Sequence, residues 1–178
     1  MIRNGANAVE PIATQHGTLR TRPETAADAP FLLSLHDSVK GAELARMPVS
    51  DAVRRELLDM QFRAMTMAYR SGFPTGQFDI ITLNDVPIGR LITDDGQGRF
   101  RIVYIALLPA WRNHGIGTVL MTAVLDRPRR LGSRCEAIVA SDNQASRRLW
   151  LGLGFAECES DCADVLMEWP PGAAPMHG

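Results

Sequence analysis

Hydrophobic and polar residues alternate along residues 18–22, which predicts a short strand that ends at Pro23. Apolar residues then recur at steps of three and four in two stretches, so two amphipathic helices are predicted. Capping residues and breaks rich in glycine or proline give their limits. We expect the first helix to run from Thr25 or Asp28 to a loop at 41–48, and the second to run from Ser50 or Asp51 to a break at 71–76.

The second helix carries an apolar stripe that consists of Val53, Leu57, Met60, Ala64, Met67 and Ala68. The Met and Phe residues of this region suit the lining of a substrate pocket, namely Met60, Phe62, Met65, Met67 and Phe73. An apolar stripe on a helix more often faces the core, so we interpret it as core.

Three strand-like runs follow at 77–83, 86–93 and 99–108. The pair Asn84-Asp85 separates the first two runs and a glycine-containing segment separates the next two, which predicts an antiparallel meander. The remaining elements are expected to be a helix from about Gly115 to between Asp126 and Leu131, weakened at Pro128, a strand at 134–140, a helix at 144–153, a strand that starts at Gly154 and a last strand at 163–169. This order predicts a mixed α/β sheet.

The length of 178 residues suits one domain. An apolar fraction of 46% and a charged fraction of 22% are typical of a globular protein. We expect a single domain over residues 18–170, between flexible tails at 1–17 and 171–178.

The net charge of −1 provides no global basic field that would attract nucleic acid or anionic lipid. No apolar run approaches the ~20 residues of a membrane helix, and the first residues lack the apolar stretch of a secretory signal. The three cysteines, Cys135, Cys158 and Cys162, fit no zinc or redox motif. These features predict a cytoplasmic protein without nucleic-acid, membrane or metal partners. Lys40 is the single lysine among 19 basic residues, which indicates a G+C-rich bacterial genome rather than a function.

The candidate chemistry lies in residues 107–118, where an apolar strand ends at Pro109, a polar turn follows, and Gly115 and Gly117 begin a helix. Glycine lets a ligand approach the backbone closely. The first N–H groups of a helix lack partners within the helix and attract anions. The segment therefore predicts a diphosphate site, to which Arg112 adds a charged contact.

Arg112, Gly115 and Gly117 fill the fixed positions of the motif Gln/Arg-x-x-Gly-x-Gly/Ala, and through them the chain resembles the GNAT N-acetyltransferase superfamily. A second segment resembles the family pattern Asn-x-x-Ala-x-x-Leu-Tyr-x-x-x-Gly-Phe, through Asn143, Ser146, Leu149, Trp150, Gly154 and Phe155. The resemblance extends over about residues 18–169. It implies an α/β (α+β) GNAT fold, in which a mixed, mostly antiparallel central sheet of about six or seven strands is flanked by about four helices.

The resemblance also implies where acetyl-CoA binds. The sheet splays between its fourth and fifth strands, here 99–108 and 134–140, and the pantetheine arm pairs with the backbone in that gap. The pyrophosphate lies on the N–H groups of the glycine-containing turn, and Asn143 approaches the arm near the thioester. The implied cofactor-binding residues are Leu107, Leu108, Arg112, Asn113, His114, Gly115, Ile116, Gly117, Thr118, Asn143 and Trp150.

The chain departs from the family at two positions that handle protons. Trp150 stands where relatives often have a tyrosine general acid, and an indole N–H does not titrate usefully. Trp150 packs either on the cofactor arm or in the core. Arg101 stands where some relatives have a glutamate base, so Tyr104 and Glu136 are the nearest candidates for a catalytic base, and a water relay is the alternative.

The resemblance predicts an acetyl-CoA-dependent N-acetyltransferase, in which a primary amine of a small molecule or peptide attacks the thioester directly. The amine enters under the two N-terminal helices, and homodimers are common among such relatives. One alternative is a GNAT-fold module that binds CoA as a sensor or scaffold and transfers nothing, as the missing tyrosine and glutamate suggest. Another is an interaction protein that uses an arginine-rich face without CoA, which the intact motif argues against.

Overall fold

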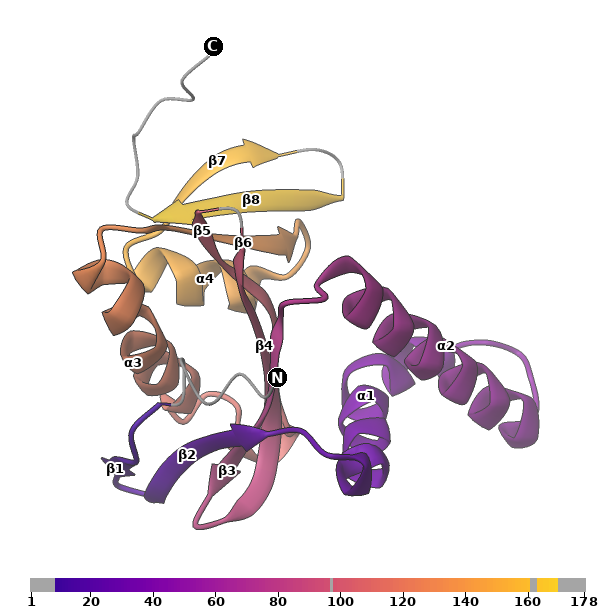
Figure 1. The fold of residues 1–178 in the computed structure, drawn as a ribbon. Helices are drawn as coiled ribbons and strands as arrows, with labels where there is room; N and C mark the ends of the chain where they lie inside the picture. The colour runs from indigo at the N-terminus through magenta and orange to yellow at the C-terminus, as the bar shows by residue number, and fades with distance from the viewer. Residues whose placement is uncertain (1–8, 97, 161–162, 170–178) are drawn as a thin grey trace.

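The computed structural model describes residues 9–96, 98–160 and 163–169, without the side chains of residues 159 and 160. These residues form an eight-stranded sheet in the order β1-β2-β3-β4-β5-β6-β8-β7 (Figure 1). The strands are β1 Ile12–Thr14, β2 Gly17–Pro23, β3 Gln77–Leu83, β4 Val86–Gly96, β5 Arg99–Leu107, β6 Arg134–Ala140, β7 Ala156–Ser160 and β8 Asp164–Trp169.

Among the described strands, neighbours run antiparallel except for β5 and β6, which are parallel. The predicted mixed, mostly antiparallel sheet is therefore confirmed. The turn between β3 and β4 is the predicted two-residue turn, because Asn84 and Asp85 have positive φ angles of 50° and 65°.

The sheet begins earlier in the chain than predicted. Residues 12–14, which fall in the expected flexible tail, form β1 and pair with β2, where Ile12 lies opposite Leu19. A hydrogen bond from Thr14 Oγ1 to the Gly17 carbonyl closes the hairpin at 2.8 Å. A three-residue strand is too short to give an alternating pattern, so the sequence gives no sign of it.

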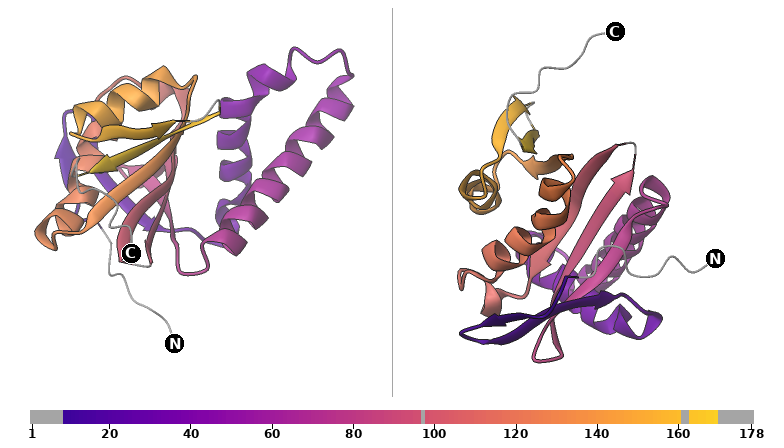
Figure 2. Two further views of the ribbon diagram at one scale, coloured as in Figure 1. Left: turned by 90° about the horizontal axis from the view of Figure 1, so that it is seen from above. Right: turned by 60° about the vertical axis from the view of Figure 1, so that its left-hand side comes forward.

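Helices cover both faces of the sheet (Figures 1 and 2). On one face, α3 and α4 bury residues such as Leu120 and Trp150 against β3–β6, and this layer holds the main core. On the other face lie α1 and α2. The helices are α1 Ala29–Leu44, α2 Asp51–Gly72, α3 Ile116–Arg130 and α4 Gln144–Gly152, with short 3₁₀ turns at Ala26–Asp28 and Pro109–Trp111.

One of the predicted helix limits is wrong. The first helix continues through Gly41 to Leu44, because the buried Leu44 side chain anchors its last turn in the protein. The third helix ends within its predicted limits, since it continues past Pro128, which lies inside it. It ends at Arg130, two residues before Gly132, which has a positive φ of 63°.

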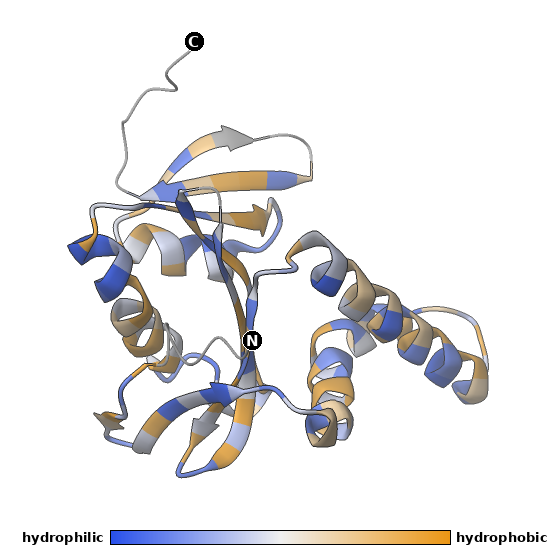
Figure 3. Cartoon of the chain, in the orientation of Figure 1, coloured by the Kyte–Doolittle hydropathy of each residue, from blue (hydrophilic) through white to orange (hydrophobic). Residues whose placement is uncertain are grey.

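The second helix begins as predicted, with Ser50 Oγ accepting from the Val53 N–H, but its stripe is not core. The structure describes α2 in full, and none of its residues is buried. Figure 3 shows hydrophobic positions along α2 where the helix stands clear of the sheet. The interpretation of the stripe as core is therefore wrong.

None of the helices in the described part of the chain is both long enough and apolar enough to cross a membrane. Burial raises the pKa of the Cys135 thiol to about 12, which opposes thiolate chemistry there. Cys162 and the expected tail at 171–178 lie outside the described residues.

Candidate active site

The β5–β6 pair opens into a split partway along both strands. Within these two fully described strands, parallel pairing ends where Ile102 lies opposite Ala137. Beyond that point β5 remains paired with β4 as far as Leu107, while β6 remains paired with β8. The predicted splay between these strands is therefore confirmed.

Two arginines hold the closed end of this split together. Glu136 on β6 is buried, and its Oε2 accepts from Arg99 Nη1 at 3.2 Å while its Oε1 accepts from Arg101. Both carboxylate oxygens thus have cationic partners, beside the paired residues and away from the open end. The geometry makes Glu136 an ion-pair partner that joins two strands, and it does not support the predicted role of a catalytic base.

The open edge of β5 presents alternate residues to the split. The Leu108 N–H donates to the Ile88 carbonyl at 2.8 Å, and the Leu108 carbonyl accepts from the Trp111 N–H. Both polar groups of Leu108 are thus used within the protein, which argues against its predicted contact with the pantetheine arm. Because backbone groups alternate sides along a strand, Leu107 and Ile105 direct theirs away from β4 and into the split. Ile105 is absent from the predicted set, although the two-residue period from Leu107 points to it.

The first turn of α3 begins beside the open end of the split. Gly115 is the N-cap with a φ of 74°, and the Val119 N–H makes the first helical bond to its carbonyl at 3.0 Å. The N–H groups of Ile116, Gly117 and Thr118 precede that bond, and no side chain in the described residues caps the turn. Such a turn attracts an anion through unpaired N–H groups and the helix dipole.

The space over this turn suits a diphosphate. Apart from its own helix and chain neighbours, a Cβ at Gly117 would meet a single protein atom within 4 Å, Leu149 Cδ2 on α4 at an ordinary contact distance of 3.8 Å, so the space between the two helices is open here. Asn113 contributes a left-handed residue with a φ of 60°, which bends the chain into the helix. The residues present therefore fit a phosphate-bearing cofactor at this position.

The two side chains nearest this turn have partners within the protein. Arg112 Nε donates to the Leu107 carbonyl at 2.8 Å, and its Nη2 donates to Ser38 Oγ on α1 at 3.2 Å. This guanidinium therefore braces the turn against β5 and α1, and its predicted phosphate contact stays a prediction. His114 Nδ1 lies 2.7 Å from the Arg112 carbonyl. The His114 ring lies 5.3 Å from that of His16, which the β1–β2 turn brings here and which the sequence had not linked to this turn.

On the other side of the split, α4 is held by its own side chains. Asn143 Oδ1 accepts from the Ser146 N–H at 3.0 Å and caps the helix, which leaves Nδ2 as the group that can reach a ligand. Trp150 is only 2% exposed. Its Nε1 donates to Ser146 Oγ at 3.2 Å and its ring lies 5.1 Å from that of Phe155. The structure therefore supports a core tryptophan and not contact with the cofactor arm.

Tyr104 lies on β5 beyond the last pair with β6, on the face that carries α1 and α2. Its ring centroid is 5.6 Å from that of Tyr69 on α2. Burial, above all, raises the pKa of the Tyr104 phenol to about 12, so the phenol is protonated at neutral pH. A protonated phenol donates a hydrogen bond but cannot accept a proton from an amine, which argues against the predicted role of base.

Residues 45–155 match the Acetyltransferase (GNAT) family, which is more than half of the chain. The chain belongs to the GNAT acetyltransferase family. No curated protein sequence matches it significantly.

Solved structures share this GNAT fold at low sequence identity. The PaiA N-acetyltransferase of Thermoplasma acidophilum, solved with coenzyme A, is 16% identical with a TM-score of 0.63, covering 84% of this chain and 97% of that one. RimJ of Mycobacterium smegmatis, solved with CoA-disulfide, is 21% identical with a TM-score of 0.62, covering 90% and 86%. YncA of Salmonella typhimurium, a putative acetyltransferase solved with acetyl-CoA, is 19% identical with a TM-score of 0.51, covering 90% and 99%.

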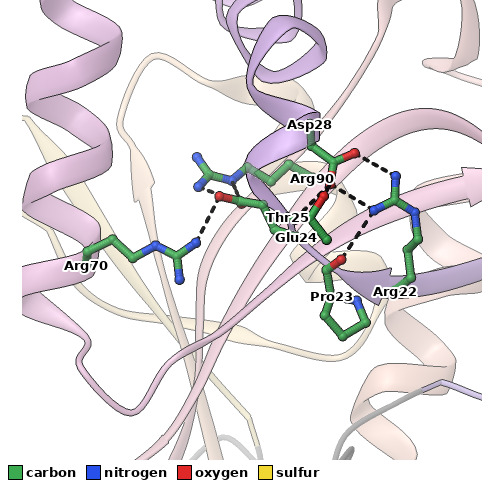
Figure 4. Close-up of polar contacts among 7 residues, drawn as sticks. All are labelled: Arg22, Pro23, Glu24, Thr25, Asp28, Arg70 and Arg90. Carbon is green, nitrogen blue, oxygen red and sulfur yellow. Dashed lines mark hydrogen bonds and ion pairs between the residues drawn. The ribbon is translucent and has the colours of Figure 1, made fainter.

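In this GNAT chain an ion-pair network attaches α1 and α2 to the sheet (Figure 4). Glu24, just after β2, accepts from Arg70 on α2 at 2.9 Å and from Arg90 on β4 at 3.0 Å. Next to it, Asp28 accepts from both Nη atoms of Arg22 and from the Thr25 N–H. The Arg22 guanidinium holds the pKa of the Asp28 carboxyl well below its usual range. These contacts fix the helices that cover the Tyr104 face of the sheet.

Proposed function

We propose that this protein is an acetyl-CoA-dependent N-acetyltransferase that transfers the acetyl group to a primary amine of a small molecule or peptide. The observation that carries the proposal is the uncapped first turn of α3, with Gly115 and Gly117, beside the open end of the β5–β6 split. Family membership and the neighbours solved with coenzyme A or acetyl-CoA support it.

Acetyl-CoA would supply an acetyl group activated as a thioester. The N–H groups of residues 115–118 would bind its pyrophosphate, and the open space beside Gly117 would admit the phosphates. Ile105 through its backbone groups and Leu107 through its N–H would hold the extended arm on the free edge of β5, since the Leu107 carbonyl already accepts from Arg112. A backbone N–H on this edge would also stabilise the negative charge that develops on the thioester oxygen.

The acceptor amine would enter from the face of α1 and α2 and attack in its neutral form. Tyr104 is protonated at neutral pH and both oxygens of Glu136 are engaged by arginines. We infer that the C–S bond breaks with CoA leaving as its thiolate, that the amine proton leaves through water, and that Tyr104 acts as a hydrogen-bond donor on the acceptor side. The homodimer that the family resemblance predicts has no role in this proposed reaction.

The proposal is tested by calorimetric titration of acetyl-CoA and CoA, followed by an assay of free thiol release with a panel of amines and peptides. We expect binding of both nucleotides and thiol release with a subset of the amines. Absence of CoA binding contradicts the proposal. Tight binding without turnover on any amine or peptide contradicts the enzymatic part and favours a CoA-binding module.

The Gly117→Val variant tests the proposed cradle directly. The added side chain would fill the gap toward Leu149 and weaken CoA binding by about 2 kcal/mol, roughly thirtyfold. Gly152→Val is the matched control, because Gly152 also lies in a helix and has open space around its Cβ position. Unchanged affinity in Gly117→Val, or an equal loss in both variants, would contradict the placement of the cofactor.

A further inference from the structure

A cavity of about 900 Å³ lies beside α3. It is lined by α3, by strands β3, β4 and β5, and by residues 9–13, which include the start of β1. Thr122 and Asp126 are among the lining residues of α3. With 3.6 residues per turn, these two residues lie on the opposite side of the helix from Gly117. The cavity is therefore on a different side of α3 from the proposed cofactor cradle.

Asp79 is the carboxylate that β3 contributes to the cavity. Alternate residues of a strand share a face of the sheet, so Asp79 lies on the same face as Ile81, which belongs to the core under α3. Asp79 is only 3% exposed. Its Oδ2 accepts from Gln77 Nε2 at 2.8 Å, whereas its buried Oδ1 has no hydrogen-bond partner among the described residues. The cavity thus contains a strong acceptor that the described part of the protein leaves unsatisfied.

The arginines that line the cavity have acceptors other than Asp79. The pairs are Arg127 with Asp95 at 3.1 Å, Arg129 with the Leu153 carbonyl at 3.2 Å, and Arg130 with Asp126 at 2.8 Å. Burial, above all, raises the pKa of Asp79 to about 6, so its carboxyl is mostly ionised at pH 7.5. At that pH the cavity therefore holds a buried negative charge without a cationic partner in the described residues.

Apolar side chains surround this charge. Leu91 lies opposite Asp79 in the β3–β4 pairing, and Phe100, Ile12 and Val119 line the cavity from β5, β1 and α3. Apolar walls with a few polar groups that fix the orientation of a ligand are typical of small-molecule sites, and so is a volume of this size. We propose that the cavity binds a small organic amine as its cation. The ammonium group donates to Asp79 Oδ1, and the apolar part of the amine packs against Leu91, Phe100 and Val119.

The cost of the buried carboxylate supports a binding role. A buried charge without a partner destabilises the fold, and titratable groups with pKa values displaced in this way concentrate at functional sites. An ammonium group against Oδ1 offsets that cost through a charge-assisted hydrogen bond. Tyr104 and the proposed entry of the acceptor amine lie on the opposite face of the sheet. The amine in this cavity is therefore a ligand of a second site and is not the group that receives the acetyl.

Two probes of similar size and different charge test the proposal. Benzylamine is a cation at pH 7.5, and benzyl alcohol is its neutral counterpart. Each is titrated into the full chain at pH 7.5, and backbone amide NMR shifts report the affinity and the place of binding. We expect benzylamine to bind at least about tenfold more tightly than benzyl alcohol, because only the cation makes the charged hydrogen bond. The largest shifts should fall at Asp79 and Val119.

Three variants separate the charge of Asp79 from the shape of the cavity. Asp79→Asn should weaken benzylamine at least about tenfold and leave benzyl alcohol within about twofold. Asp126→Asn is the matched control, because Asp126 lines the same cavity but is already paired with Arg130, and it should change both affinities by less than about twofold. Ala123→Phe should weaken both probes by filling the cavity. Circular dichroism should show unchanged folding in all three variants.

Several outcomes would overturn the proposal. They are equal affinity for the two probes, no binding of benzylamine at millimolar concentration, shifts confined to the Tyr104 face, and a benzylamine affinity that Asp79→Asn leaves unchanged. An equal loss in Asp79→Asn and Asp126→Asn would overturn the specific role of Asp79. These titrations contain no CoA, so their result is independent of the proposed enzymatic function.

Discussion

The Tyr104 phenol lies half-buried against Tyr69, and its pKa is raised to about 12 mainly because burial disfavours the charged form. Glu136, the other candidate base, accepts hydrogen bonds from Arg99 and Arg101, which occupy both of its oxygens. At the scale of single residues, the surroundings of each group thus decide its chemistry. Neither side chain of the right chemical type is therefore placed to act as a base, because the Tyr104 phenol is protonated and both Glu136 oxygens have arginine partners.

The Tyr104→Phe variant tests this conclusion through the pH dependence of turnover. Because the phenol remains protonated below its pKa, its removal should leave the ascending limb of the kcat profile between pH 6 and 9 unchanged. We expect kcat to fall by less than about tenfold, since only a hydrogen-bond donor is lost. Tyr69→Phe serves as the control on α2. Loss of the ascending limb in Tyr104→Phe alone would show that Tyr104 is the base after all.

At the scale of elements, one carboxylate links three segments that are distant in sequence. Glu24 pairs with Arg70 on α2 and with Arg90 on β4, and the Arg70 guanidinium stacks on the Phe78 ring at 3.7 Å. Arg90 is only 1% exposed, so Glu24 compensates a buried guanidinium. Glu24 therefore attaches the helices on the proposed acceptor side, where α1 is held also by the contact between Ser38 and Arg112, whereas the proposed cofactor site is built on the other face of the sheet.

The Glu24→Gln variant should affect the functions of the two faces of the sheet differently. Loss of the carboxylate leaves the buried Arg90 uncompensated, and we expect the free energy of unfolding to fall by about 3 kcal/mol. The KM for the acceptor amine should rise while the CoA dissociation constant stays within about twofold, because α3 is unaffected. Denaturant unfolding, calorimetry and initial rates measure these quantities.

Asp85→Asn is the matched control for Glu24→Gln, because Asp85 forms an exposed pair with Arg20 at 3.4 Å. Its removal should change the free energy of unfolding by less than about 0.5 kcal/mol. An equal loss of unfolding free energy in the two variants would contradict the structural role of Glu24. A large loss of CoA affinity in Glu24→Gln would contradict the separation between the α1–α2 face and the proposed cofactor site.

At the scale of the whole molecule, two buried carboxyls make stability respond to pH in opposite directions. Asp28 has a pKa held below its usual range by Arg22, so it stabilises the fold above about pH 4 and loses that effect as the pH falls. Burial raises the pKa of Asp79 on β3 to about 6. Its folded-state pKa thus exceeds the unfolded value, and its contribution to stability is lost as the pH rises from about 4 through 6.

The Asp79→Asn variant should therefore be more stable than the original protein at neutral pH. The rise of the Asp79 pKa from about 4 to about 6 corresponds to about 3 kcal/mol in the free energy of unfolding. Urea denaturation at pH 7.5 and at pH 4.5 should show a gain that is clearly smaller at the lower pH. A gain that does not depend on pH would mean that Asp79 is not the titrating group.

Local signals account for much that could be predicted. Several features depend only on a few neighbouring residues. They are the positive φ angles of Asn84 and Asp85, the helix caps at Ser50 and Asn143, and the left-handed conformation of Gly115. The residue types at such positions predict these features directly, and the same holds for the motif that begins α3. The predicted cofactor-binding residues of this turn remain predictions, although its uncapped N–H groups and the space beside Gly117 agree with them.

The sequence by itself determined the order of the strands and helices from β2 onward and the glycine turn, because each follows from periodicity, capping or backbone conformation. The splayed sheet was implied by the resemblance to the family. Only the tertiary structure decided that the apolar stripe of α2 is not buried, that Trp150 is core and that Glu136 is clamped by two arginines. Burial and ion pairing depend on which distant segments meet. The pattern of apolar and polar residues along one helix or strand does not indicate which distant segment packs against it.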